Sequence, residues 1–263
     1  MTVTGPTPVT PPRFVDVLPD ASALALAASE RFVEMAERAI ADRARFVVAL
    51  SGGSTPRRSY ELLAREPLLS RVSWSRVHVV WGDERCVPPT DARSNYRMAR
   101  EALLDHVPVP AGNVHRMHGE DDPALAAASY EMTLRELLRT PNGPPSAAPG
   151  RNIDLALLGL GDNGHTASIF PGSAAVDERR KWVMAEDVPS VSMWRITLTA
   201  PVLNAASEVL FLVSGATKAS VVARVLDGPR EPRELPAQLI APMPGRVQWM
   251  LDRDAAAELD ETS

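Results

Sequence analysis

Short apolar runs that end in glycine, serine or aspartate alternate with longer segments of helical periodicity along most of the chain. Runs of this length predict β-strands, and several are too continuously apolar to leave one face in water. Strands of that kind lie inside a parallel sheet whose two faces are covered by helices. The chain is therefore expected to be an α/β protein with an open, mostly parallel twisted sheet and helices on both faces.

The predicted elements can be placed along the chain. Strands are predicted at residues 46–50, 77–81, 114–117, 153–158, 182–185, 195–198, 209–213 and 247–251. Helices are predicted at residues 21–43, 56–65, 94–106, 123–138, 201–206 and 216–226. Because no repeat or linker interrupts the alternation, residues 13–263 are expected to form a single domain. Residues 1–12 are rich in Pro and Thr, lack the regions of a signal peptide, and are expected to be a disordered leader.

Composition excludes several classes of partner. The chain has 28 Lys and Arg against 33 Asp and Glu, and its net charge of −5 argues against nucleic-acid binding. No apolar stretch approaches the ~20 residues that span a bilayer, so no membrane association is expected. A single cysteine, Cys86, cannot form an internal disulfide, which fits a reducing cytoplasm. We expect a cytoplasmic monomer or small homo-oligomer.

The segment "SGGSTP" follows a predicted buried strand and opens a helix. Gly52 and Gly53 let the backbone approach a ligand, and the first N–H groups of the helix point toward it. The hydroxyls of Ser51, Ser54 and Thr55 add hydrogen-bonding groups. The G-K-[ST] ending of a P-loop is missing, which argues against a nucleoside triphosphate. These five residues are predicted to bind an anion; an ordinary strand-to-helix turn is the alternative.

Lys218 is one of only two lysines in a chain whose other basic residues are arginines. It follows the apolar run 209–213 and falls in the first turn of a predicted helix. A cation there opposes the helix macrodipole unless an anion lies between them. Lys218 is therefore predicted to bind the same anion as the "SGGSTP" segment, with Arg195 as a weaker third partner. A solvated lysine is the alternative.

The segment "GLGDNGHTASIFPGS" leaves another predicted strand through three glycines and sets down His165. Its glycines match a dinucleotide fingerprint, but that motif needs a crossover helix of ~10 residues or more, and Pro171 and Gly172 follow too soon. A nicotinamide cofactor is therefore not expected. The turn instead holds a histidine, suited to proton transfer near neutral pH, beside the side chain of Asn163 and the N–H of Gly164.

The segment "GDERC" follows a third predicted strand. Either Asp83 or Glu84 is expected to face the crevice, and Arg85 beside it keeps such a carboxylate ionised. A surface salt-bridge cluster is the alternative. His115 and His118 would face opposite sides of an extended segment, and no third ligand has suitable spacing. No metal and no cofactor are predicted.

Taken together, "SGGSTP", "GDERCVPPTDARSNY", "GLGDNGHTASIFPGS", "RITLTAPVLNAA" and "SGATKA" resemble the 6-phosphogluconolactonases of the glucosamine/galactosamine-6-phosphate isomerase superfamily. The resemblance runs in order from about Phe46 to Leu251. It implies the Rossmann-like fold shared with glucosamine-6-phosphate deaminase. It also implies hydrolysis of 6-phospho-D-glucono-1,5-lactone to 6-phosphogluconate, in the oxidative pentose phosphate pathway. One departure is Asn163, where many lactonases have Asp or Ser.

Two other functions compete with this hypothesis. Deaminases of the same superfamily have a glutamate five residues after the histidine, where this chain has Phe170, and tyrosine in place of Arg85. A non-catalytic sugar-phosphate sensor would carry a basic DNA-reading helix-turn-helix, which neither end of the chain supplies. Both differences favour the lactonase.

The resulting hypothesis assigns a role to each candidate residue. The substrate's phosphate docks on Ser51 to Thr55 with Lys218 and Arg195. Asn163 and Gly164 of the His165 turn are also expected to bind the substrate. Neutral His165 takes a proton from the attacking water and returns it to the ring oxygen, while Asp83 orients His165 or the sugar hydroxyls. Arg85 and the N–H groups around Gly164 stabilise the oxyanion. The reaction needs no metal.

Overall fold

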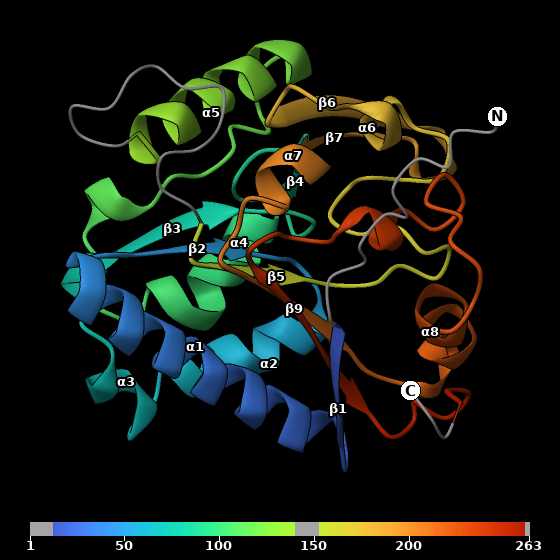
Figure 1. Cartoon of the computed structure of the whole chain (residues 1–263). Coiled ribbons are helices and arrows are strands. Elements are labelled where there is room, and N and C mark those ends of the chain that lie inside the picture. The colour runs from blue at the N-terminus through green and yellow to red at the C-terminus, as the bar shows by residue number, and fades with distance from the viewer. Residues whose placement is uncertain (1–12, 140–152, 261–263) are drawn as a thin grey trace, which may run out of the picture.

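The computed structural model describes residues 13–139 and 153–260 and has at its centre a six-stranded sheet in which every strand is parallel to its neighbours (Figure 1). The strand order is β1-β9-β8-β5-β2-β3. In chain order these strands are β1 (Arg13–Leu18), β2 (Phe46–Leu50), β3 (Val77–Trp81), β5 (Leu155–Leu158), β8 (Glu208–Val213) and β9 (Arg246–Asp252). The fold class is confirmed. The predicted leader lies outside the described residues.

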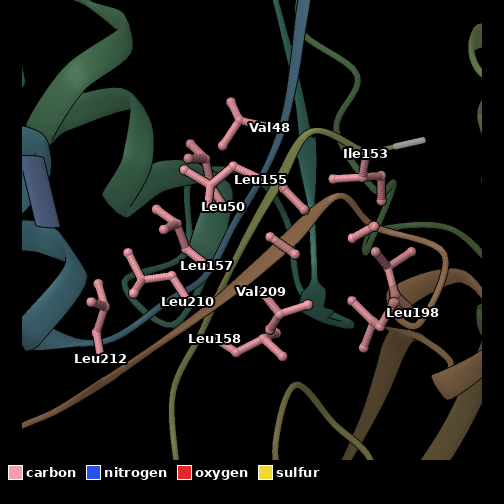
Figure 2. Close-up of a cluster of buried hydrophobic side chains, with 14 of the residues drawn as sticks. Val48, Leu50, Ile153, Leu155, Leu157, Leu158, Leu198, Val209, Leu210 and Leu212 are labelled. Carbon is pink, nitrogen blue, oxygen red and sulfur yellow. The ribbon is translucent and has the colours of Figure 1, made fainter. Parts of the chain in front are cut away.

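The central strands are buried along their whole length, which explains their continuous apolar sequence. Every residue of β2, β5 and β8 is buried. Leu155, Leu157 and Leu210 point to one side of the sheet, into the core beneath the helices (Figure 2). Leu158 and Val209 point to the other side (Figure 2). Burying each such side chain contributes about 1.5–3 kcal/mol, so the sheet is a rigid base for the loops that leave it.

Helices lie on both sides of this sheet, with α1, α2 and α3 on one side and α5 and α7 on the other (Figure 1). The α-helices are α1 (Ala21–Arg43), α2 (Ser54–Leu63), α3 (Leu68–Arg71), α4 (Asn95–Ala99), α5 (Pro123–Leu137), α6 (Ala174–Asp177), α7 (Ala200–Leu203) and α8 (Ala219–Leu226). Asp20 caps α1, because its Oδ1 accepts the N–H groups of Ser22 and Ala23. None of the described helices is long and apolar enough to cross a membrane.

A second, antiparallel sheet of three strands was not predicted. Its order is β4-β7-β6, formed by β4 (Asp83–Arg85), β7 (Met193–Leu198) and β6 (Val183–Val188). The two sheets meet at Gly82, whose N–H donates to Leu50 O in the main sheet and whose carbonyl accepts the N–H of Leu198. Residues Asp83–Arg85 therefore form a strand rather than a loop, and they lie beside β7 at the carboxyl edge of the main sheet.

Several predicted boundaries differ from those observed. The strand predicted at residues 114–117 is wrong, because only an isolated bridge pairs Val114 with Val79. The edge strand β1 was missed. The helix predicted at 94–106 consists of α4 followed by a π-helical turn, Arg100–Leu104, and the one predicted at 216–226 opens with a 3₁₀ turn, Ala216–Lys218, before α8.

Candidate active site

A cleft of about 390 Å³ opens at the carboxyl edge of the main sheet, where the loops after β8, β5, β2 and β3 meet. Predicted site residues from four separate sequence segments and from β7 line it: Ser51, Gly52, Gly53, Asp83, Arg85, His165, Arg195 and Lys218. Neighbouring strands are spaced ~4.8 Å apart, so the loops after β8 and β3 are separated by roughly 14 Å. The order of the strands puts Lys218 and Arg85 at opposite ends, with the His165 turn between them.

Ser54 and Thr55 do not line this cleft. They face a separate cavity of about 380 Å³ together with Arg58 and Asp252. The chain turns at Gly53, where φ is +112°, and α2 begins at Ser54, so Ser54 and Thr55 follow the turn and line a different cavity from Ser51. The prediction that all five residues of the segment face one ligand is therefore wrong for these two.

His165 occupies a half-buried position in the turn after β5. Its ring stacks on Phe170, with the ring centroids 4.1 Å apart. Gly161 makes room for the ring, since a Cβ at that position would lie 1.9 Å from Cε1 of His165. Burial disfavours the charged imidazole and lowers the pKa of His165 to about 4, although Asp83 pulls in the opposite direction. The ring is therefore neutral at physiological pH.

Asn163 fixes the tautomer of that neutral ring. Its Oδ1 lies 2.6 Å from Nδ1 of His165 and also accepts the backbone N–H of His165 at 3.3 Å. Because a backbone N–H can only donate, the facing atom of Asn163 is the oxygen, and Nδ1 must carry the hydrogen. The lone pair is then on Nε2. Asn163 was predicted to bind substrate, but it is not among the residues that line the cleft and acts on the histidine instead.

The backbone groups of Gly164 make hydrogen bonds within the protein and not the contact with an oxyanion that was predicted. Its N–H donates to the carbonyl of Gly161 at 2.9 Å, and its own carbonyl accepts the N–H of Ala237. The N–H is thus already used and does not point into the cleft to stabilise an oxyanion. Glycine is required here because φ is +80° and a Cβ would lie 2.6 Å from Cδ2 of Leu235.

Asp83, not Glu84, lines the cleft. Its buried carboxylate accepts hydrogen bonds from Ser168 Oγ at 2.7 Å and from Asn95 Nδ2 at 3.1 Å, which hold it in one orientation. Glu84 turns toward the start of α4, where it accepts the hydroxyl of Ser94 and nearby backbone N–H groups. Glu84 therefore anchors a helix, and Asp83 is available to the site.

Asn95 was not predicted to line the cleft, although it was expected near a helix start. It packs against Gly52, where a Cβ would lie 1.8 Å from its Oδ1. Asn95 Nδ2 also donates to Asp83, and these hydrogen bonds join the start of α4 to β4. The motif "GDERCVPPTDARSNY" contains both residues, but its spacing does not show that Asn95 lies in the cleft.

Two arginines lie side by side at the Asp83 end of the cleft. Arg85 and Arg195 are paired residues on the adjacent strands β4 and β7. Within residues 13–139 and 153–260, the buried Nε atom of each has no hydrogen-bond partner. Burial and the nearby charge of Arg85 lower the pKa of Arg195, and its closest carboxylate oxygen, Asp83 Oδ2, is 4.0 Å from Nη1. Paired guanidinium groups with unused donors attract an anion or a developing oxyanion. Arg195 thus lies with Arg85 and not with Lys218.

Lys218 lies at the opposite end of the cleft in the 3₁₀ turn that precedes α8. Its Nζ donates to the carbonyl of Leu160 at 2.8 Å and to Oδ1 of Asp162 at 2.5 Å. The ion pair lowers the pKa of the Asp162 carboxyl group. Sequence reasoning missed Asp162, because its partner is far away along the chain.

The similarity of this chain to known proteins agrees with the site described above. The family described as glucosamine-6-phosphate isomerases/6-phosphogluconolactonase matches residues 19–249. The chain belongs to this family. Among family members, the 6-phosphogluconolactonases of Nostoc and of Mycobacterium tuberculosis are each 40% identical to it, over 93% of this chain and 98% of the relative. The resemblance inferred from the sequence motifs is confirmed.

Solved structures of family members share the fold. The 6-phosphogluconolactonase from Trypanosoma cruzi superposes with a TM-score of 0.83 at 30% identity, covering 95% of this chain and 98% of that one. A monomeric glucosamine-6-phosphate deaminase superposes with a TM-score of 0.76 at 22% identity, covering 93% and 99%. The deaminase likeness shows the fold alone, so the choice between the two activities depends on the residues of the site.

Within residues 13–139 and 153–260, no group of three or more His, Cys, Asp or Glu side chains is arranged to hold a metal ion. His115 does not pair with His118; its Nε2 lies 3.3 Å from Nδ1 of His78 on β3.

Proposed function

We propose that the chain is a 6-phosphogluconolactonase, which hydrolyses 6-phospho-D-glucono-1,5-lactone to 6-phosphogluconate. The observation that carries the proposal is the position of the His165 ring in a cleft that has Lys218 at one end and a pair of arginines at the other. A base between two cationic regions suits an ester that carries a phosphate at one end and develops an oxyanion at the other. The names of the relatives support the same activity.

The phosphate would bind at the Lys218 end. Nζ of Lys218 supplies a point charge, and the backbone at Gly52 and Gly53 lies in the same cleft just before α2. Each charge-assisted hydrogen bond contributes about 1.5–3 kcal/mol, so a few are enough to hold a small sugar phosphate. Ser54 and Thr55 line the other cavity and are left out of this proposed site. Ser51 is kept in the proposed phosphate site, because it lines the cleft and its buried hydroxyl has no hydrogen-bond partner among the described residues.

The lactone carbonyl would then lie at the arginine end. Nε2 of His165 takes a proton from water as the water oxygen attacks C1, and the carbonyl electrons move onto its oxygen. Arg85 and Arg195, which line this end of the cleft, stabilise that oxyanion with their positive charge. The intermediate collapses with cleavage of the bond between C1 and the ring oxygen, which receives the proton back from His165. Asp83 is held in place to accept a hydrogen bond from a sugar hydroxyl.

The cleft lacks the carboxylate that the deaminases have five residues after the histidine. Isomerisation of a sugar phosphate requires proton transfers that lactone hydrolysis does not, and the position five residues after the histidine is the apolar Phe170. Its ring is stacked on His165 and leaves no carboxylate there. The scheme above uses no metal ion.

The test is lactone hydrolysis followed by proton release and corrected for the spontaneous reaction, with and without a chelator. We expect an enzyme-dependent rate that the chelator does not change, and no release of ammonia from glucosamine 6-phosphate. A chelator-sensitive rate would overturn the metal-free scheme, and ammonia release would overturn the choice of reaction. We also propose that residues 13–263 form a single domain. We propose further that the protein is cytoplasmic, which cell fractionation tests, and that it is a monomer or small homo-oligomer, which size-exclusion chromatography with light scattering tests.

A further inference from the structure

Lys218 already has an anionic partner before any substrate arrives. Its ammonium group contacts Asp162, and both residues line the cleft. The proposed phosphate site therefore contains a carboxylate that belongs to the chain itself. Two anions that share one ammonium group at hydrogen-bonding distance repel each other. A phosphate dianion at Lys218 therefore competes with Asp162 for the ammonium group.

The two members of this pair are held very differently. The side chain of Lys218 is only 24% exposed, and its Nζ stays anchored by the carbonyl of Leu160. The side chain of Asp162 is 83% exposed, and in the described part of the chain the carboxylate has no hydrogen-bond partner other than Lys218. Rotation of Asp162 into solvent would thus free Lys218 without moving it, at the small cost of an exposed ion pair.

We propose that Asp162 is an exchangeable counterion of Lys218, which the substrate's phosphate displaces, and that this exchange contributes to the preference for phosphorylated ligands. A neutral ligand leaves the Asp162–Lys218 pair intact and finds no net charge there. A phosphate dianion carries enough charge to displace the carboxylate and gain the lysine. The inference rests on the proposed function, because it assumes that the phosphate binds at Lys218.

The perturbation that isolates this effect is Asp162→Asn. Removing the competing carboxylate should strengthen binding of inorganic phosphate about threefold to fivefold, the upper part of the range of about 1.4-fold to fivefold that is expected for one exposed ion pair. The ratio of kcat/KM for the phosphorylated lactone to that for unphosphorylated glucono-1,5-lactone should rise by a similar factor. Asp177→Asn is a matched control, because Asp177 is an exposed ion-paired aspartate outside the cleft and its loss changes the net charge equally.

A double-mutant cycle separates exchange at Lys218 from a general change in charge. In the Lys218→Ala background, Asp162→Asn should change phosphate affinity by less than about 1.5-fold, because no ammonium group remains to compete for. Isothermal titration calorimetry with inorganic phosphate measures all five proteins: wild type, the three single variants and the double variant. Asp162 lies on the surface, and thermal denaturation verifies that each variant is folded.

Two outcomes would overturn the proposal: phosphate affinity unchanged or weakened by Asp162→Asn, or a gain of equal size in the Lys218→Ala background. The failure of the proposed function looks different. A wild-type protein that binds phosphate in the expected pattern but does not hydrolyse the lactone would refute the lactonase and leave the exchange standing. An active lactonase in which Asp162→Asn brings no gain would refute the exchange alone.

Discussion

Asn163→Asp changes the charge beside the proposed base while keeping an oxygen acceptor near Nδ1. In the wild-type protein Oδ1 of Asn163 lies 2.6 Å from Nδ1 of His165, and the pKa of the ring is lowered to about 4 by burial. A folded-state pKa below the usual value keeps the ring neutral as the pH falls. The wild-type kcat/KM should therefore stay constant from neutral pH down to about 5 and fall as the pH passes through about 4.

A carboxylate in contact with the imidazole favours the charged ring. An opposite charge within ~4–6 Å moves a pKa by about one to three pH units, which would bring His165 in the variant between about 5 and 7. If the variant ring titrates near pH 6, about a tenth of it is neutral at pH 5, against about nine tenths in the wild type. The variant should thus lose roughly tenfold in relative kcat/KM at pH 5 and much less at pH 8.

The assay is kcat/KM from pH 4 to pH 8 at constant ionic strength, with the spontaneous reaction subtracted at each point. Asn113→Asp is a suitable control, because it makes the same change of charge outside the cleft. Nδ2 of Asn113 donates a hydrogen bond to Ser75 O and makes no contact with His165. NMR titration of the His165 ring gives the pKa independently of turnover. If Asn163→Asp leaves both the acidic limb and the ring titration where they are in the wild type, the contact between Asn163 and His165 does not control the base.

Two further predictions concern the surroundings of the base. Gly161→Ala places a methyl group where the ring of His165 now lies, so we expect the ring to be displaced and kcat to fall at least about tenfold. A crystal structure of the variant with the His165 ring in its present position would contradict this. Arg195→Met removes a donor from the arginine end, and kcat should fall by about 10²-fold with little change in KM. A raised KM with unchanged kcat would return Arg195 to the phosphate end.

Much of the fold could be predicted because its central strands have a strong local signal. The runs at β2, β5 and β8 are buried on both faces, and their short length and the turn residues that bound them favour strands over helices. The polar, three-residue strand β4 has no comparable pattern. Its pairing with β7 depends on residues more than a hundred positions away, which local periodicity cannot reveal.

The candidate site was predictable to the extent that its residues directly follow strands. His165, Asp83 and Lys218 lie in one cleft because the parallel strands that precede them end at the same edge of the sheet. The direction of individual groups was not predictable, since it depends on the turn at Gly53 and on the hydrogen bond made by the N–H of Gly164. The roles of Asn163 and Asp162 rest on contacts that sequence spacing does not encode.

The most direct test of the account is the lactonase activity of His165→Gln, measured by proton release after subtraction of the spontaneous rate. Glutamine keeps a polar side chain in the turn but cannot accept and return a proton as imidazole does. We expect kcat to fall by about 10²–10⁴-fold while affinity for inorganic phosphate stays within about twofold of the wild type. A variant that hydrolyses the lactone within about threefold of the wild-type rate would contradict the assignment of His165 as the general base.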